Sequence, residues 1–220
     1  MKLGLVVHAV GVQKEADRLV DSFYELGPVT KNVELCLVTD DDYGDDDMVR
    51  FNPARAKNIG LRRLLPHVDG VVCIDADYII PPGLFEFLME PTMQPFHVWV
   101  RRRDISEKDA ESRDWVKWVR MGVFGDCWGS CNYMSTENWL RMGGWDERTF
   151  GWGGDDDLLH IRIGQFGIER RRIDAIPLMH IQHERRLWST EGQRGSENIK
   201  FARQPQQNYL QGEHLAQGLD

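Results

Sequence analysis

The sequence lacks several features that would place the protein in a specialised class. No apolar stretch approaches the roughly 20 residues of a membrane-spanning helix, and the apolar run at residues 1–7 is too short for a signal peptide. The formal net charge is −8, which argues against non-specific nucleic-acid binding, because such binding depends on Lys and Arg neutralising phosphates. We therefore expect a cytoplasmic protein with no transmembrane segment and no nucleic-acid partner.

The cysteines do not indicate a disulfide-rich or zinc-binding protein, and no repeat or linker divides the chain. Cys36, Cys73, Cys127 and Cys131 form neither a recognisable disulfide framework nor a CxxC zinc pair. The 220 residues contain no internal repeat and no linker, and a hydrophobic content of 41% is enough to build one core. The sequence predicts one domain over residues 1–203 and a peripheral tail, rich in Gln and Gly, over residues 204–220.

Strand and helix patterns alternate in the first half of the chain. Short apolar runs predict strands at 3–7, 33–39 and 70–74, and amphipathic or proline-initiated segments predict helices at 13–26, 52–65 and 81–90. This alternation favours an α/β fold with a doubly wound sheet flanked by helices. Ligands of such sheets bind beyond the carboxyl ends of the strands.

The second half is less regular. We predict strands at 96–100, at 177–183 and ending near Ser135, a helix at 137–142 capped by Thr136, and a helix at 155–166. The charged segment 104–120 is compatible with a helix or a mobile flap. Two basic clusters, at 101–103 and 170–172, are interpreted as solvated turns or helix ends rather than as an anion-binding patch.

An acidic pair, Asp75 and Asp77, follows the apolar run that ends at Ile74. Two carboxylates at a strand end repel each other, and partial burial makes their desolvation unfavourable unless a cation lies between them. Oxygen ligands of this kind suit Mg²⁺ or Mn²⁺, usually together with waters and substrate phosphates. The alternative interpretation is a pair of turn or capping aspartates.

A second acidic motif is more specific. Gly151-Trp152-Gly153-Gly154 precedes Asp155-Asp156-Asp157, so a tryptophan interrupts a glycine-rich turn and three carboxylates follow it. Glycines allow backbone turns that are closed to other residues, and acidic residues are favoured in the first turn of a helix. Helix-start carboxylates without chemistry would explain the aspartates but not the tryptophan between the glycines.

Further candidate ligands are histidines and a third acidic group. His180 and His183 lie near the end of a predicted strand, where residues three apart point to opposite faces, so we expect at most one of them in the site. Imidazole suits Mn²⁺ better than Mg²⁺. One of Asp40, Asp41 or Asp42 is a candidate acceptor of hydrogen bonds from a nucleotide base or ribose.

The motifs of this chain resemble those of GT-A-fold glycosyltransferases. They occur in the order 51–60 (FNPARAKNIG), Asp75-Ala76-Asp77, Gly143-Gly144-Trp145-Asp146 and the 151–157 segment. The resemblance is strongest to the galactosyltransferase C-terminal type and to the family 2 enzymes, and it implies a GT-A-like, Rossmann-like nucleotide-binding mixed sheet flanked by helices in a single α/β domain. It extends over most of the chain, from about Leu3 to His183. It departs from the family at Asp155, where glutamate is common, and at the loop after the first strand.

The resemblance implies an inverting transfer of a sugar from a nucleotide-sugar, with UDP-sugars favoured, to an acceptor hydroxyl of a glycan or lipid-linked molecule. Peripheral contact with a membrane surface stays open. The implied metal ligands are Asp75, Asp77 and either His183 or His180, holding Mn²⁺ or Mg²⁺ against the donor diphosphate. The implied base is Asp156, with Asp155 beside the acceptor. The implied substrate contacts are Trp152, Gly153, Gly154, Arg55, Asn58, Asp40 and Asp75.

Two other functions were compared with this one. A sugar nucleotidyltransferase would be expected to have a glycine-rich phosphate loop with a basic residue after the first strand, and Gly11 followed by Gln13-Lys14 is a poor match. A non-catalytic glycan- or metal-binding module would suit the high tryptophan content. The presence of both acidic motifs favours the enzyme.

Overall fold

The computed structural model of the chain describes residues 1–43, 52–112, 114–121, 123–125, 131–151, 153–182, 198–204 and 208–210. Three residues named above, Trp152, His183 and Cys127, lie outside the described residues, as do residues 44–47 of the acidic run that begins at Asp40.

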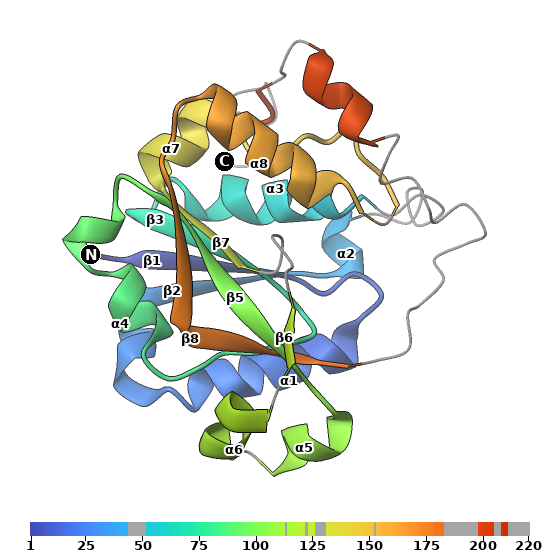
Figure 1. Cartoon of the computed structure of the whole chain (residues 1–220). Helices are drawn as coiled ribbons and strands as arrows, with labels where there is room; N and C mark the ends of the chain where they lie inside the picture. The colour runs from blue at the N-terminus through green and yellow to red at the C-terminus, as the bar shows by residue number, and fades with distance from the viewer. Residues whose placement is uncertain are drawn as a thin grey trace.

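One mixed sheet runs through the centre of the molecule (Figure 1). Its strands follow the order β2-β1-β3-β7-β5-β8-β4, and β6, off this path, pairs with β5. β1 is parallel to β2 and β3, whereas β7 is antiparallel to β3 and β5. The predicted α/β architecture with a mixed sheet is therefore confirmed. The strands are β1 (Leu3–His8), β2 (Val33–Val38), β3 (Gly70–Asp75), β4 (Tyr78–Ile79), β5 (His97–Ile105), β6 (Val123–Gly125), β7 (Cys131–Ser135) and β8 (Arg170–Ile181).

Helices cover both faces of this sheet (Figure 1). α3, α7 and α8 pack on one face through a core that includes Leu61, Trp139 and Leu159. α1 and α4 pack on the other face through a second core that includes Phe23 and Phe85. The helices are α1 (Gln13–Tyr24), α2 (Asp40–Tyr43), α3 (Pro53–Leu64), α4 (Leu84–Leu88), α5 (Glu107–Glu111), α6 (Trp115–Met121), α7 (Thr136–Met142) and α8 (Asp155–Gln165), with 3-10 turns η1 (Gly27–Asn32), η3 (Pro91–Met93) and η4 (Ile199–Arg203).

The start of α3 follows from local sequence. Pro53 occupies the first turn, where its missing N–H leaves no hydrogen bond unmade. The Asn52 side chain accepts a hydrogen bond of 2.9 Å from the Arg55 N–H and so caps the helix. The helix predicted from Asn52-Pro53 is confirmed, and its buried face lies against β1 and β2.

Several boundaries differ from the predictions. α4 begins at Leu84 rather than at Pro81, because Gly83 adopts φ +85° just before it, and β4 takes up residues 78–79. Ser135, not Thr136, caps α7, because its hydroxyl accepts from the Asn138 N–H. Of the two alternatives for segment 104–120, helix is observed, as the short helices α5 and α6 that follow β5.

The interpretation of the basic clusters as turns or helix ends is wrong. Residues 101–103 lie inside β5 and residues 170–172 begin β8, two strands that pair in parallel from His97↔Arg170 onward. The pairing satisfies the backbone of both segments, so their charged side chains do not prevent strand formation.

The expectation of a peripheral tail fails at residues 208–210. Leu210 is 1% exposed and belongs to the α3/α8 core, and the Tyr209 N–H donates to the Gly143 carbonyl at 2.9 Å. The missing side chains of Gly143 and Gly144 explain this contact, since a Cβ at either glycine would approach Asn208 or Leu210 to about 3 Å or less.

Candidate functional site

The carboxyl ends of β1 and β3 bring a histidine and an aspartate together. His8 and Asp75 are register partners, and His8 Nε2 lies 3.1 Å from Asp75 Oδ1. Beyond the end of β1, the Gly11 N–H donates to Asp40 Oδ1 at 2.9 Å. Asp40, predicted as a nucleotide contact, therefore lies beside the loop after β1. The neighbouring Asp42 instead caps its own short helix by accepting from the Thr39 N–H.

Asp77 lies next to His180, one of the two histidines predicted as metal ligands. His180 Nε2 is 3.2 Å from Asp77 Oδ2, and His180 Nδ1 is 2.8 Å from Asp104 Oδ1. Strand register produces this arrangement, because His180 of β8 pairs with Tyr78 of β4 on one side and with Asp104 of β5 on the other. The pairing of β4 with β8 thus places the second aspartate of the first motif against a late strand.

These residues fit a divalent cation in part. A histidine whose far nitrogen is held by a carboxylate is a frequent arrangement around protein-bound metals, because the carboxylate fixes the ring and its tautomer. Within the described residues, no group of three or more His, Cys, Asp or Glu is arranged to hold a metal ion. Asp77 and His180 could supply two ligands, and Mg²⁺ or Mn²⁺ commonly takes its others from waters and substrate phosphates.

The second acidic motif forms a left-handed turn and then a helix. Gly151, Gly153 and Gly154 have φ values of 73°, 84° and 85°, a region that favours glycine, so the predicted role of these glycines is confirmed. Buried Asn198 holds the turn by donating to the carbonyls of Phe150 and Gly153 at 3.2 and 2.7 Å. α8 begins immediately afterwards at Asp155.

A lysine joins the two acidic motifs. Lys57 of α3 is 3% exposed, and its Nζ lies 3.3 Å from Asp75 Oδ1, 3.4 Å from Asp155 Oδ2 and 3.8 Å from Asp156 Oδ1. The same ammonium group lies 4.2 Å from the centre of the Trp145 ring. Asp75, Asp155 and Asp156 therefore belong to one site.

The charges of this site perturb one another. Burial alone would lower the pKa of Lys57, but Asp75, Asp156 and Asp155 outweigh it and hold that pKa well above its usual value. Burial raises the pKa of Asp75, but Lys57 and then His8 oppose it, and the net effect lowers it. Desolvation and the charge of Asp155 raise the pKa of Asp156 well above that of an ordinary carboxyl group.

The two α3 residues predicted near the nucleotide have different surroundings. Asn58 is fully buried and binds the loop after α7: its Nδ2 donates to the Trp145 carbonyl at 2.9 Å and its Oδ1 accepts from the Trp145 N–H at 2.9 Å. Arg55 is partly exposed near the start of the helix. Asn58 thus positions Trp145, the ring against which Lys57 lies.

Sequence reasoning missed Lys57, His8 and Asp104. Lys57 lies inside the 51–60 segment that carried the resemblance, between Arg55 and Asn58, but a lysine in a helix pattern gives no sign of burial. His8 follows an apolar run at a strand end, which is the same signal that identified Asp75. Asp104 gives no recognisable signal, since its role depends on the register of β5 and β8.

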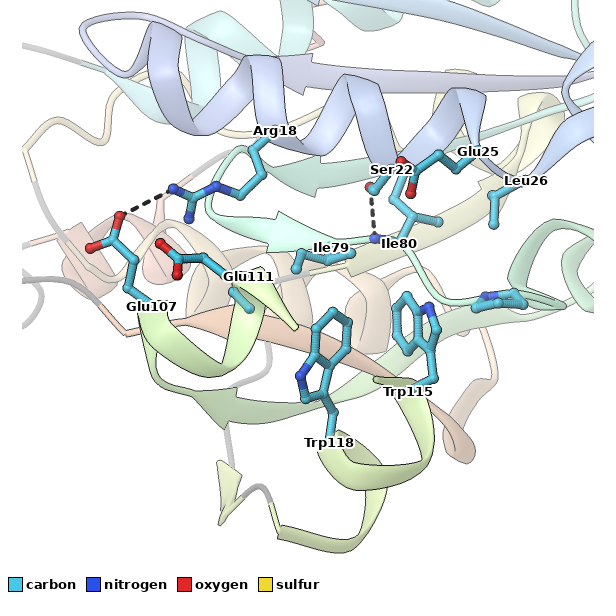
Figure 2. Close-up of a pocket in the computed structure, with 12 residues that line it drawn as sticks. Arg18, Ser22, Glu25, Leu26, Ile79, Ile80, Glu107, Glu111, Trp115 and Trp118 are labelled. Carbon is cyan, nitrogen blue, oxygen red and sulfur yellow. Dashed lines mark hydrogen bonds and ion pairs between the residues drawn. The ribbon is translucent and has the colours of Figure 1, made fainter. Parts of the chain in front are cut away.

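A separate cavity of about 450 Å³ lies between α1 and the α5–α6 segment (Figure 2). Trp115 and Trp118 point into it from α6, and Arg18 of α1 donates to Glu107 across it. None of the residues predicted for the site lines this cavity. In the part of the chain that the structure describes, no helix is long and apolar enough to cross a membrane.

Comparisons with known proteins show which family and which fold this chain resembles. Residues 120–184 match a family model described as the N-terminal domain of galactosyltransferase, which is less than half of the chain but includes the glycine turn, Asp155, Asp156 and His180. No curated protein sequence matches significantly.

Solved structures share the fold at low identity. The catalytic domain of Drosophila β1,4-galactosyltransferase 7, in complex with xylobiose, is 17% identical with a TM-score of 0.61, covering 83% of this chain and 71% of that one. S. aureus TarS with UDP-GlcNAc is 12% identical with a TM-score of 0.66, covering 92% and 65%. GalNAc-T7 with UDP, GalNAc and Mn²⁺ is 14% identical with a TM-score of 0.61, covering 84% and 44%.

The chain thus spans less than two thirds of the TarS and GalNAc-T7 chains. At these identities the structural likeness establishes the fold, while the family match covers the segment that contains the second acidic motif. The chain therefore has the GT-A glycosyltransferase fold and carries a galactosyltransferase-like segment at residues 120–184.

Proposed function

We propose that the protein is a metal-dependent, inverting glycosyltransferase that transfers a hexose from a UDP-sugar to an acceptor hydroxyl. The observation that carries this proposal is the meeting of the two acidic motifs at Lys57, where Asp75 and Asp155 lie within 3.4 Å of one ammonium group. A donor-side carboxylate and an acceptor-side carboxylate then belong to the same site, as a transfer between two substrates requires.

The donor side is formed by the carboxyl ends of β1, β2 and β3. Such strand ends are where open α/β sheets bind ligands. His8, Gly11 and Asp40 surround this edge, and Asp40 is the acceptor we assign to the base or ribose of the nucleotide. Arg55 is assigned to the same side of the site.

The metal position is assigned to Asp77 and His180, with Asp75 and His183 as further ligand candidates. Asp104 holds the His180 ring from its other nitrogen, and this supports a ligand role for Nε2. When bound, Mn²⁺ or Mg²⁺ supplies positive charge against the diphosphate leaving group. The complex of Drosophila β1,4-galactosyltransferase 7 that contains manganese, UDP-Gal and xylobiose supports this class of donor and metal.

The acceptor side is assigned to the start of α8. The acceptor oxygen attacks the anomeric carbon from the face opposite the diphosphate, the bond from that carbon to the diphosphate oxygen breaks, and the hydroxyl proton passes to Asp156. A carboxylate with a raised pKa binds that proton more readily than an ordinary one. Asp155 is placed beside the acceptor hydroxyl, and Trp152, Gly153 and Gly154 are assigned to the acceptor surface.

The first test is calorimetric titration of UDP, GDP, CDP and dTDP, each with and without Mn²⁺. Metal-dependent binding of UDP alone would support the proposal. Transfer from UDP-Gal, UDP-GlcNAc and UDP-GalNAc to xylobiose and to other sugar acceptors would then identify the hexose, and NMR of the product anomer would test inversion. If a folded protein binds none of the nucleotides, the proposal fails and a non-catalytic glycan- or metal-binding module becomes the better interpretation.

A further inference from the structure

Lys57 has an unusual environment for a lysine. It lies in the second turn of α3, its side chain is 3% exposed, and its Nζ contacts carboxylates from two segments that are about eighty residues apart in the sequence. Asp75 ends a strand, whereas Asp155 and Asp156 begin a helix on the covering layer. Lysine is rarely this buried unless it is paired, because an unpaired buried charge is strongly unfavourable.

The carboxylates around Lys57 are in turn stabilised by its ammonium group, because their own negative charges are partly or fully buried. Asp155 is 8% exposed, and Asp156 is about a quarter exposed, with its Oδ1 buried and making no hydrogen bond within the described residues. Gly154 at the start of α8 offers no side chain to cap the helix. The positive end of the helix dipole compensates only part of this charge. Lys57 supplies a full positive charge 3.4 Å from Asp155 and 3.8 Å from Asp156.

The Trp145 ring and Asn58 help to hold the Lys57 ammonium group in place. The Trp145 ring lies 4.2 Å from Nζ, and its π face attracts a cation. Asn58, the next residue of α3, fixes the Trp145 backbone through two hydrogen bonds of 2.9 Å. Adjacent residues of one helix thus bind the carboxylates and the backbone of the tryptophan whose ring supports the lysine.

We propose that Lys57 is a positioning residue that sets the placement of Asp155 and Asp156 relative to Asp75. This inference rests on the proposed function, because only a transfer between two substrates requires a fixed distance between the donor-side carboxylate Asp75 and the acceptor-side carboxylates Asp155 and Asp156. Lys57 reaches the Asp75 oxygen that also contacts His8, whereas Asp77 pairs with His180. A cation at Asp77 and His180 is therefore compatible with the lysine in its observed place.

The test compares Lys57→Met with Lys117→Met. Lys117 also pairs with an aspartate, Asp109, at 2.6 Å, but this pair is more than a third exposed and lies on the α5–α6 segment. For Lys57→Met we expect kcat to fall at least about 100-fold, the loss typical of a misplaced reacting group, with the KM for the donor nearly unchanged. Lys117→Met should behave like the wild type. A role confined to folding would lower the apparent kcat only in proportion to the unfolded fraction, so kcat is expressed per folded protein. Equal kcat values for the folded Lys57→Met and wild-type proteins would overturn the proposal.

A second readout does not depend on activity. Because Asp75 loses its ammonium partner, Mn²⁺ should raise the thermal midpoint of Lys57→Met by several degrees more than that of the wild type or of Lys117→Met. Without metal, Lys57→Met should lower the midpoint by about 10 °C, and Lys57→Met/Asp155→Asn should recover much of this loss. If the two substitutions add without coupling, the proposed link between Lys57 and Asp155 is wrong, whether or not the wild type transfers a sugar.

If Lys57→Met does not fold, the Lys57→Arg variant tests the positioning role of Lys57 instead. Arginine keeps the charge but presents a longer, planar group, so it would displace the carboxylates it pairs with. We expect a folded protein with kcat reduced at least about tenfold, because of the same misplacement. Wild-type turnover in Lys57→Arg would contradict the proposal. Failure of the wild type itself to bind UDP or transfer a sugar would refute the proposed function and leave the stability test of the link standing.

Discussion

The Nε2 atom of His180 lies 3.2 Å from Oδ2 of Asp77, although the two residues are about a hundred positions apart in the sequence. β8 runs between β5 and β4, so its register fixes both neighbours of the histidine: Asp104 at one nitrogen and Asp77 at the other. His180, a residue distant in sequence from the first acidic motif, thus lies against Asp77 and is itself held by Asp104.

Asp104→Asn should weaken Mn²⁺-dependent UDP binding by roughly 10- to 100-fold, because the carboxylate that orients the His180 ring is lost. Calorimetry with and without Mn²⁺ measures this effect, and binding of UDP without metal should not change. Asp109→Asn is the matched control, since Asp109 lies on α5 and pairs with Lys117. An Asp104→Asn protein with wild-type metal dependence would argue against His180 as a ligand.

Asp156→Asn should lower kcat by about 100- to 10,000-fold and leave Mn²⁺-dependent UDP affinity unchanged, since an amide cannot accept the acceptor's proton. Asp157→Asn, which makes the same change at the exposed third aspartate, should retain most activity. Steady-state kinetics and UDP titrations of both variants distinguish the two positions. Comparable activity of Asp156→Asn and Asp157→Asn would remove Asp156 from the role of base.

Gly144→Ala should destabilise the protein far more than Gly151→Ala. Both glycines have positive φ, 79° and 73°, so each substitution should lower the free energy of unfolding by about 1–2 kcal/mol through backbone strain. A Cβ at Gly144 would also approach Asn58 Oδ1 to 2.5 Å, whereas no atom of the described residues lies within 4 Å of a Cβ at Gly151.

Because Asn58 is fixed by its bonds to Trp145, we expect a further loss of about 2–3 kcal/mol for Gly144→Ala. Urea unfolding of the two variants measures the difference. Equal stabilities would mean that the loop after α7 moves freely away from α3.

Stability should fall as the pH drops below about 6.5, in part because of His97. Burial lowers the pKa of this histidine from 6.5 to about 3, and the charge of neighbouring His160 adds to the effect. Above pH 6.5 His97 is neutral in both states and contributes no pH dependence. Below it, the unfolded state takes up a proton that the folded state does not, so the free energy of unfolding decreases.

The expected contribution of His97 is about 2 kcal/mol between pH 7 and pH 5, since each unit of separation between the two pKa values corresponds to about 1.4 kcal/mol. Urea unfolding of wild type and His97→Gln at both pH values isolates it, because the other titrating groups are common to the two proteins. The difference in stability between them should shrink as the pH falls. A difference that does not change with pH would mean that His97 takes up its proton equally readily in the folded and unfolded states.

The sequence predicted the parts of the site that depend on local chemistry. The positive φ values of Gly151, Gly153 and Gly154 follow from the glycines themselves, and the start of α3 follows from Asn52 and Pro53. Asp75 stands out in the sequence because it and Asp77 follow an apolar run, where two carboxylates repel each other unless a cation lies between them. The assignments of Asp77, Asp155 and Asp156 to metal and proton chemistry remain proposals.

The sequence was least informative where the conformation or burial of a segment depends on contact with a segment distant in the chain. Residues 170–172 look like an exposed turn until β5 supplies hydrogen bonds along their backbone. Leu210 lies in a polar tail, yet it is buried in the core beside Gly144, where a Cβ would approach its Cγ to 3.0 Å.

Composition, periodicity and spacing alone determined the fold class, the strand edge that carries Asp75 and the glycine turn before Asp155, because each reflects the intrinsic preferences of neighbouring residues. The tertiary structure decided which charges meet. Lys57 reaches Asp75 and Asp155 because α3 and α8 pack on the same face of the sheet, and His180 meets Asp77 because β8 pairs with β4 in one register. Electrostatic pairing depends on distances of 3–4 Å between side chains, and such distances are set by packing rather than by position in the chain.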